Sequence, residues 1–285
     1  MLRDILNFRY LFVRKWQKFV LDFYVESSLH VALSVVSLAY ISLKLAHEEV
    51  SFSLLIFIFS SALFAYNFVK YFSIFKAEKI KNTFQKLIFL ISSFSLIVSI
   101  NFFLQLVIIA KIFVLVGAIL VLFYTIPINY RKNNLRNTNG WKIYVVVLTW
   151  VLLTVGVPLS INLMNYGTLL FYLLFIQGTY IFVSIIAFDI RDLKIDDPKL
   201  KTIPQQLGVI RSKLLGSNLL ILLILITLYK FGFNTPFSVS ALLCFVTLLI
   251  LLNLVNSKSS KYFTNFWIES LPIFWAINFY LFSYF

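Results

Sequence analysis

Long runs of apolar residues, separated by short polar connections, occupy most of this chain. The runs fall at 28–46, 51–75, 84–101, 104–127, 142–162, 166–188, 212–231, 237–256 and 262–284. Each run has about the 18 residues, or more, that a helix needs to cross the hydrocarbon core of a bilayer. We therefore predict an all-α integral membrane protein with nine transmembrane helices.

The first part of the chain has a different pattern. Residues 1–27 alternate basic and aromatic side chains with apolar ones, as in Arg14, Lys15 and Trp16. Such a basic amphipathic segment is expected to lie at the membrane surface. Residues 28–284 contain no linker that would separate a second domain. We therefore predict a single polytopic membrane domain over residues 1–285, with the surface segment at 1–27 and the bundle at 28–284.

Composition and charge agree with this interpretation. The sequence is 61% hydrophobic, has a mean hydropathy of +0.92 and carries a net charge of +14. With a cytoplasmic N-terminus, 22 of the 25 Lys and Arg residues fall on the cytoplasmic side. We therefore expect the N-terminus in the cytoplasm and the C-terminus on the opposite side, in a bacterial inner membrane. The basic residues form no patch for a nucleic acid, so none is expected as a partner.

One stretch concentrates the charge that the rest of the chain lacks. Residues 188–208 read FDIRDLKIDDPKLKTIPQQLG, and Asp189, Asp192 and Asp196 are spaced i, i+3, i+7. On a continuing helix these three carboxylates share one face. Carboxylate oxygens suit Mg²⁺, which combines one or two of them with substrate phosphates. The alternative is a solvated helix end that is capped by charge.

This stretch resembles the second aspartate-rich motif of the UbiA superfamily of intramembrane prenyltransferases. Asp192 and Asp196 take the D-x-x-x-D positions, with Asp189 three residues before them. The tail that follows the motif is matched by Lys201, Thr202, Pro204, Leu207 and Gly208. A second similarity is the sequence YTIP at 124–127, followed by Arg131 and Lys132, which looks like the Tyr-Ser-x-Pro and basic loop of the family.

The resemblance implies a UbiA-like bundle with a cavity that faces the cytoplasm. It also implies the Mg²⁺-dependent transfer of an isoprenyl group from its diphosphate to an aromatic or lipophilic acceptor. Metal and basic side chains neutralise the charge that grows on the leaving diphosphate.

The family pattern assigns roles to particular residues of this sequence. Asp189, Asp192 and Asp196 are the expected catalytic residues, and Asp192 and Asp196 are the expected ligands of Mg²⁺. The expected diphosphate-binding residues are Asn67, Lys70, Arg131, Lys132 and Lys201, and the expected pocket residues are Tyr71 and Tyr124.

The first aspartate-rich motif of the family is missing here. The corresponding residues 66–75 read YNFVKYFSIF, in which only Asn67 remains, and the sequence has no aspartate between Asp22 and Asp189. Lys70, one helical turn from Asn67, could meet a phosphate directly. A family member of impaired activity, acting as a prenyl-lipid-binding or accessory membrane protein, is therefore the alternative hypothesis. A transporter or flippase is a further alternative, although the apolar runs hold few ionisable groups.

Overall fold

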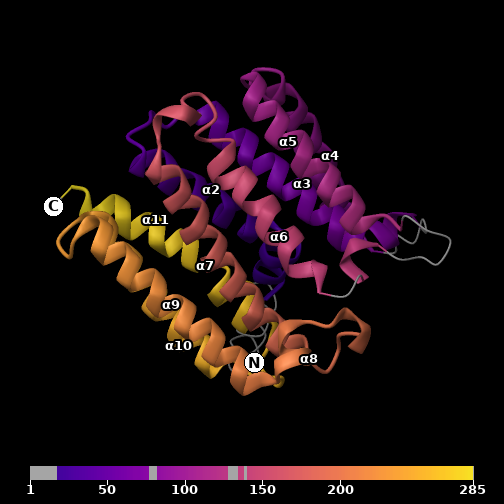
Figure 1. The fold of residues 1–285 in the computed structure, drawn as a ribbon. Coiled ribbons are helices and arrows are strands. Elements are labelled where there is room, and N and C mark those ends of the chain that lie inside the picture. Colours follow the sequence, from indigo (N-terminus) through magenta and orange to yellow (C-terminus); the bar gives the residue numbers. More distant parts are fainter. Residues whose placement is uncertain (1–17, 77–81, 128–133, 138–139, 285) are drawn as a thin grey trace, which may run out of the picture.

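The computed structural model describes residues 18–76, 82–127, 134–137 and 140–284 (Figure 1). Its α-helices are α2 (Leu29–Leu45), α3 (Phe52–Lys76), α4 (Thr83–Phe103), α5 (Ile108–Thr125), α6 (Trp141–Val151), α7 (Thr168–Asp192), α8 (Ile203–Leu207), α9 (Val209–Phe231), α10 (Pro236–Leu254) and α11 (Leu271–Phe282). A further helix, Lys18–Glu26, precedes α2 and is bent from it by 56°. Two π-helical turns, η2 (Leu152–Gly156) and η5 (Phe263–Ile268), continue α6 and precede α11. These ranges contain no strand, which confirms the all-α fold class.

Each of the nine predicted apolar runs contains a helix. Within the described ranges, six helices are long and apolar enough to cross a membrane, or seven if the bent pair Lys18–Glu26 and Leu29–Leu45 counts as one span. The run at 142–162 is shorter as a helix than predicted, because η2 ends at Gly156, before Pro158. The chain is therefore an integral membrane protein, while the count of nine spans stays a prediction.

The helices pack in a ring in which most neighbours along the chain are also neighbours in space. Helices α2 to α4 pack in sequence, α5 packs on α3 and α6, and the ring continues through α7, α9, α10 and α11 back to α2. Figure 1 shows α3, α4 and α5 on one side and α7, α9, α10 and α11 on the other. Helix α4 has little direct contact with α5, so a seam lies between these two helices.

Two hydrophobic cores hold the ring together. The larger joins α7, α9, α10 and α11 around the fully buried rings of Phe237, Phe245 and Trp275. The smaller joins α2 and α3 around Phe57 and Leu63. Buried aromatic and branched side chains of this size dominate packing energies inside a bundle.

A buried glutamine links the two sides of the ring. Gln177 of α7 donates to the backbone oxygen of Leu38 at 3.0 Å and to Ser42 Oγ at 2.8 Å, both on α2. Its carbonyl oxygen accepts from Thr154 Oγ1 of η2 at 2.7 Å. The amide thus satisfies its hydrogen bonds inside the bundle, where water does not reach.

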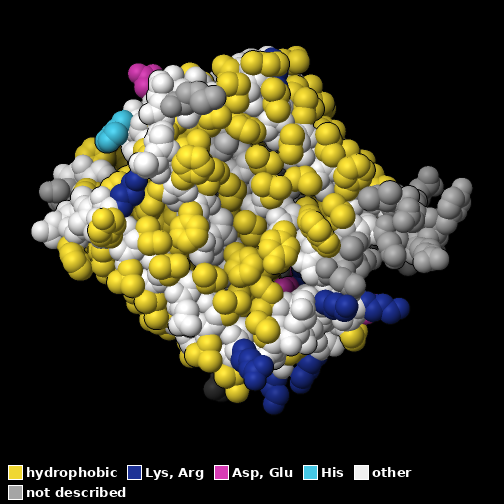
Figure 2. All heavy atoms as spheres, viewed as in Figure 1, with side chains coloured by type: hydrophobic (Ala, Val, Ile, Leu, Met, Phe, Trp, Pro, Cys, Tyr) yellow, Lys and Arg dark blue, Asp and Glu magenta, His cyan; other side chains and the backbone are white. Residues whose placement is uncertain are grey.

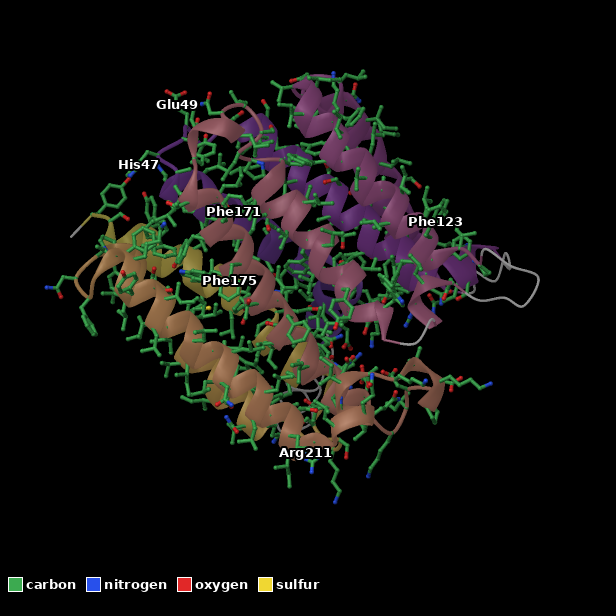
Figure 3. All side chains as sticks on the ribbon, in the orientation of Figure 1. His47, Glu49, Phe123, Phe171, Phe175 and Arg211 are labelled. Atoms are coloured by element: carbon green, nitrogen blue, oxygen red, sulfur yellow. The ribbon has the colours of Figure 1, made fainter. Side chains whose placement is uncertain are left out.

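The surface divides into an apolar belt and two polar ends. Apolar side chains cover most of the face in Figure 2, while Lys and Arg gather at one end, over α8 and the start of α9. Arg211 lies at that end, and His47 and Glu49 lie at the other (Figure 3). Between the ends, exposed aromatics such as Phe123 and Phe171 form the surface that meets lipid. The end that carries Arg211 is called the basic end below.

Candidate functional site

An apolar cavity of about 560 Å³ lies among α3, α4, α5 and α6. Its wall runs from Phe57 to Val69 along α3 and from Phe113 to Tyr124 along α5. At 1.5 Å of rise per residue, these stretches correspond to roughly 16 to 18 Å of helix. The volume falls in the range of known ligand sites, and the length suits an extended hydrocarbon chain.

The cavity also reaches the lipid-facing surface. Leu96 and Ile100 of α4, and Leu115 and Leu122 of α5, line the cavity and are also exposed on the outside of the bundle. These four residues flank the seam where α4 and α5 make little contact. We infer that the cavity opens toward the membrane side of the protein at this seam.

Aromatic side chains with polar tips also line the cavity. Trp150 Nε1 donates a hydrogen bond of 2.5 Å to the hydroxyl oxygen of Tyr66, and both residues line the wall. Tyr124, near the end of α5, lines it as well, and its phenol lies within electrostatic range of Lys142 and Asp189. The predicted pocket residue Tyr124 thus connects the apolar cavity to the charged end of the bundle.

Lys142 joins two of the predicted aspartates. Its ammonium lies 2.8 Å from Asp189 Oδ1 and 3.4 Å from Asp196 Oδ2. Asp189 is only 2% exposed, while Lys142 and Asp196 are about one-fifth exposed. Lys142 stands at the start of α6, whereas both carboxylates come from the end of α7 and the turn after it.

The third predicted aspartate has a different partner. Both carboxylate oxygens of Asp192 accept hydrogen bonds from the guanidinium of Arg191, each at 2.7 Å. Arg191 also donates to the side chains of Thr264 and Asn265 on η5. Asp192 therefore belongs to a contact between α7 and η5, separate from the pair that Lys142 bridges.

The chain turns sharply after α7 and brings the predicted tail motif back to Lys142. The side chain of Asp197 accepts from the backbone N–H of Lys199 at 2.9 Å and caps the short helical turn that begins at Pro198. A second, small cavity of about 70 Å³ follows, lined among others by Lys142, Asp189, Lys201 and Thr202. The expected diphosphate ligand Lys201 therefore lies beside the same cavity as the Lys142 cluster.

The remnant of the first motif meets the bend before α2. Asn67 Nδ2 donates to the backbone oxygen of Ser27 at 2.9 Å. Lys70 Nζ lies 2.6 Å from Glu26 Oε2, and Tyr71 donates its hydroxyl to the backbone oxygen of Glu26 at 2.9 Å. The spacing i, i+3, i+4 puts these three side chains on one face of α3, and that face clamps the bend.

Lys261 completes this second charged group. Its ammonium lies 3.1 Å from Glu26 Oε1 and 3.6 Å from Asp22 Oδ1. Partial burial acts to lower the pKa of Lys261, but the hydrogen bond and charge of Glu26, followed by Asp22, raise it above its ordinary value. Glu26 is thus an anion between two cations, Lys70 and Lys261.

The structure thus sorts the residues that were predicted from sequence. It brings Asp189, Asp196, Lys201 and Tyr124 to one region, and it places Asn67, Lys70 and Tyr71 against Glu26 and Ser27. Arg131 and Lys132 lie outside the described residues. Sequence reasoning missed Lys142, Arg191 and Glu26 as members of these groups, because it treated Lys142 and Arg191 only as charges that set topology. No short-range spacing links Lys142 to its partners.

The carboxylates of the described chain are not arranged as a set of ligands for Mg²⁺. No three His, Cys, Asp or Glu side chains within it come together as metal ligands. The oxygens of Asp192 are taken by Arg191, and the space between Asp189 and Asp196 is taken by an ammonium. These residues do not fit a ready magnesium site, so a Mg²⁺ ion on Asp192 and Asp196 stays a prediction.

Comparisons with known proteins find a similar fold. The structure matches a solved structure of a digeranylgeranylglyceryl phosphate synthase in membranes, with a TM-score of 0.58 and 13% sequence identity over 94% of this chain and 98% of the other. No protein family and no curated protein matches the sequence. The match covers nearly the full length of both chains and confirms the UbiA-like bundle at the level of the fold.

Proposed function

We propose that this protein is a membrane prenyltransferase that moves an isoprenyl group from its diphosphate to a lipophilic or aromatic acceptor. The observation that carries the proposal is the meeting, at Tyr124, of an apolar cavity with a charged cluster that contains Lys142, Asp189 and Asp196. An isoprenyl diphosphate has this same division into a long apolar chain and an anionic head. The shared fold with a synthase that works in membranes supports the same conclusion.

The residues of the site suit the chemistry of such a transfer. When the bond between the prenyl C1 and the diphosphate oxygen breaks, its electron pair stays on the diphosphate, and Lys142 and Lys201 stand where that charge would be neutralised. The aromatic faces of Tyr66, Tyr124 and Trp150 would stabilise positive charge that develops on the allylic carbon. The acceptor then forms the new bond to C1 and releases a proton to water at the mouth of the site.

The proposed setting is a bacterial inner membrane, with the basic end in the cytoplasm and the C-terminus on the opposite side. The clustering of Lys and Arg at that end supports this orientation. Water-soluble diphosphate released in the reaction would then leave directly into the cytoplasm.

A binding protein without turnover is the second candidate function. The observation that favours it is the ion pair between Lys70 and Glu26. Lys70, which stands in the place of the missing first motif, thereby contacts its own chain. In this case the protein would hold a prenyl lipid or assist a partner membrane enzyme.

The test of the proposal is the binding of geranylgeranyl diphosphate to the purified protein in lipid nanodiscs. Gly117 lines the cavity and has open space where a side chain would begin, so Gly117→Phe should fill the cavity. We expect this variant to weaken binding by about tenfold or more, since it excludes a large buried apolar surface. The affinity for inorganic pyrophosphate should stay unchanged.

Val116→Phe provides the matched control, because Val116 is exposed on the same helix and does not line the cavity. This variant should bind like the wild type. Failure of the wild type to bind, with or without Mg²⁺, would refute both candidate functions. Release of labelled pyrophosphate in the presence of lipophilic acceptors separates the transferase from the binding protein.

A further inference from the structure

The ammonium of Lys142 lies between Asp189 and Asp196, where a metal ion would otherwise be needed to balance the two carboxylates. It approaches one oxygen of Asp189 and one oxygen of Asp196, and the three side chains are at most about one-fifth exposed. Two carboxylates that face each other without a cation repel strongly in a site of low dielectric. The ammonium is therefore the charge that keeps this pair together.

The cluster also has bonding capacity left for an anion. An ammonium has three N–H donors, and within the described chain Lys142 donates only to these two carboxylates. Its side chain lines the 70 Å³ cavity, where Lys201 supplies a second cation. That volume is about that of two water molecules, so a diphosphate would occupy it only in part.

The alternative metal ligands are engaged or missing. Asp192 is held at both oxygens by Arg191. The face of α3 that would have to supply a second carboxylate set carries Asn67, Lys70 and Tyr71, which bind the bend at Glu26 and Ser27. The two lysines at the small cavity, Lys142 and Lys201, therefore stand beside Asp189 and Asp196, while Asp192 and the face of α3 add no free carboxylate.

We propose that Lys142, positioned by Asp189 and Asp196, supplies the fixed positive charge for the diphosphate, so that binding does not require a divalent metal. This inference rests on the proposed function and identifies the cation of its site. Lys142 contacts the ligand, while Asp189 and Asp196 act through Lys142 as positioning residues.

The experiment measures the affinity of the full chain in nanodiscs for geranylgeranyl diphosphate, once with EDTA and once with Mg²⁺. The wild type should bind equally well in both. Lys142→Met should bind about tenfold more weakly or worse in EDTA, because a charge-assisted contact is lost. Mg²⁺ should then restore its binding, since the freed carboxylates of Asp189 and Asp196 can hold the metal.

Lys213→Met is the matched control, because Lys213 lies at the same end but donates to the backbone oxygen of Asn253. It should behave like the wild type. Wild-type binding that disappears in EDTA would overturn the inference. This measurement uses the wild type alone, so it does not depend on whether a variant folds. Unchanged binding of Lys142→Met in EDTA would overturn it too, as would a folded Lys142→Met that Mg²⁺ fails to restore.

These outcomes are distinct from a failure of the proposed function. A wild type that binds only with Mg²⁺ keeps the function and loses the role of Lys142. A wild type that binds under neither condition loses both.

Discussion

Lys70 and Glu26 make a two-part contact across the bend that precedes α2. The ammonium of Lys70 lies 2.6 Å from the carboxylate oxygen Oε2 of Glu26 and 3.1 Å from its backbone oxygen. The bend itself passes through Ser28, a residue other than glycine with a φ of 62°. Such a left-handed backbone conformation costs free energy, so it persists only where neighbouring contacts hold it.

Removing the Lys70 contact should therefore loosen the helix Lys18–Glu26. We expect Lys70→Met to speed amide hydrogen exchange in residues 18–28 by about tenfold, because these amides exchange through local opening. Lys86→Met, at an exposed lysine of α4, should leave this exchange unchanged. Equal exchange in the wild type and Lys70→Met would show that the bend does not depend on this contact.

The buried amide of Gln177 should be important for stability. Gln177→Leu leaves the carbonyl of Leu38 and the hydroxyls of Ser42 and Thr154 without this partner. We expect a loss of about 1 to 3 kcal/mol in the free energy of unfolding in mixed micelles, although membrane hydrogen bonds often measure near the low end. Gln105→Leu, in the exposed connection after α4, should change the stability little. A Gln177→Leu protein as stable as the wild type would contradict this role.

Two glycines in membrane helices should respond in opposite ways to alanine. A Cβ at Gly216 of α9 would come within 2.6 Å of Leu252 Cδ2 and 3.3 Å of Val183 Cγ1, and both side chains are fully buried. We expect Gly216→Ala to lower the free energy of unfolding by about 1 kcal/mol or more through overpacking. Gly117→Ala meets open space and should be neutral or stabilising by up to about 1 kcal/mol. Thermal unfolding of both variants in one detergent tests the contrast, and the reverse order would refute it.

The polar end opposite the basic end should make stability depend on pH. Hydrogen bonds from Tyr166 and then Asn162 hold the pKa of Glu48 below its ordinary value of 4.5, against a smaller opposing effect of burial. A carboxyl with a depressed pKa in the folded state stabilises the protein above the pKa of the unfolded state. This contribution should be present above pH 4.5 and should fall away as the pH drops through the lower folded pKa.

The measurement compares the Tm of the wild type with that of Glu48→Gln over this range. The wild type should be the more stable protein near neutral pH, and the difference should shrink below about pH 4.5. Glu49→Gln is the control, because Glu49 is the exposed neighbour at the same end. A difference that does not vary with pH would mean that the ionisation of Glu48 contributes nothing.

The fold could be predicted from sequence to a considerable extent. Runs of apolar residues longer than a bilayer leave few alternatives to a helical bundle, and the tail motif placed Lys201 near the aspartates of α7. The length of the helix in the fifth run, 142–162, was harder to predict. The π-helical turn at 152–156 and Pro158 end that helix without a change in hydropathy. Hydropathy alone therefore does not decide which runs cross the membrane.

The pairing of charges in the site could not be predicted. Lys142 is separated from Asp189 by 47 positions and from Asp196 by 54, and Lys70 is 44 positions from Glu26. Helix-face spacing groups residues only as far as the helix continues, and α7 ends at Asp192, before Asp196. The spacing also does not say which residue of another helix they meet. The spacing of Asp189, Asp192 and Asp196 therefore suggested one shared face, whereas Arg191 holds Asp192 apart from the other two.

The exposed seam between α4 and α5 has a consequence for kinetics. If the protein has the proposed function, a prenyl chain would reach the cavity from within the bilayer at this seam, where Leu96, Ile100, Leu115 and Leu122 line the cavity and are exposed. Encounter then takes place in two dimensions, and the effective substrate concentration is the mole fraction among lipids. Adding inert phospholipid at constant bulk substrate should slow the proposed prenyl transfer by surface dilution, as though substrate had been removed.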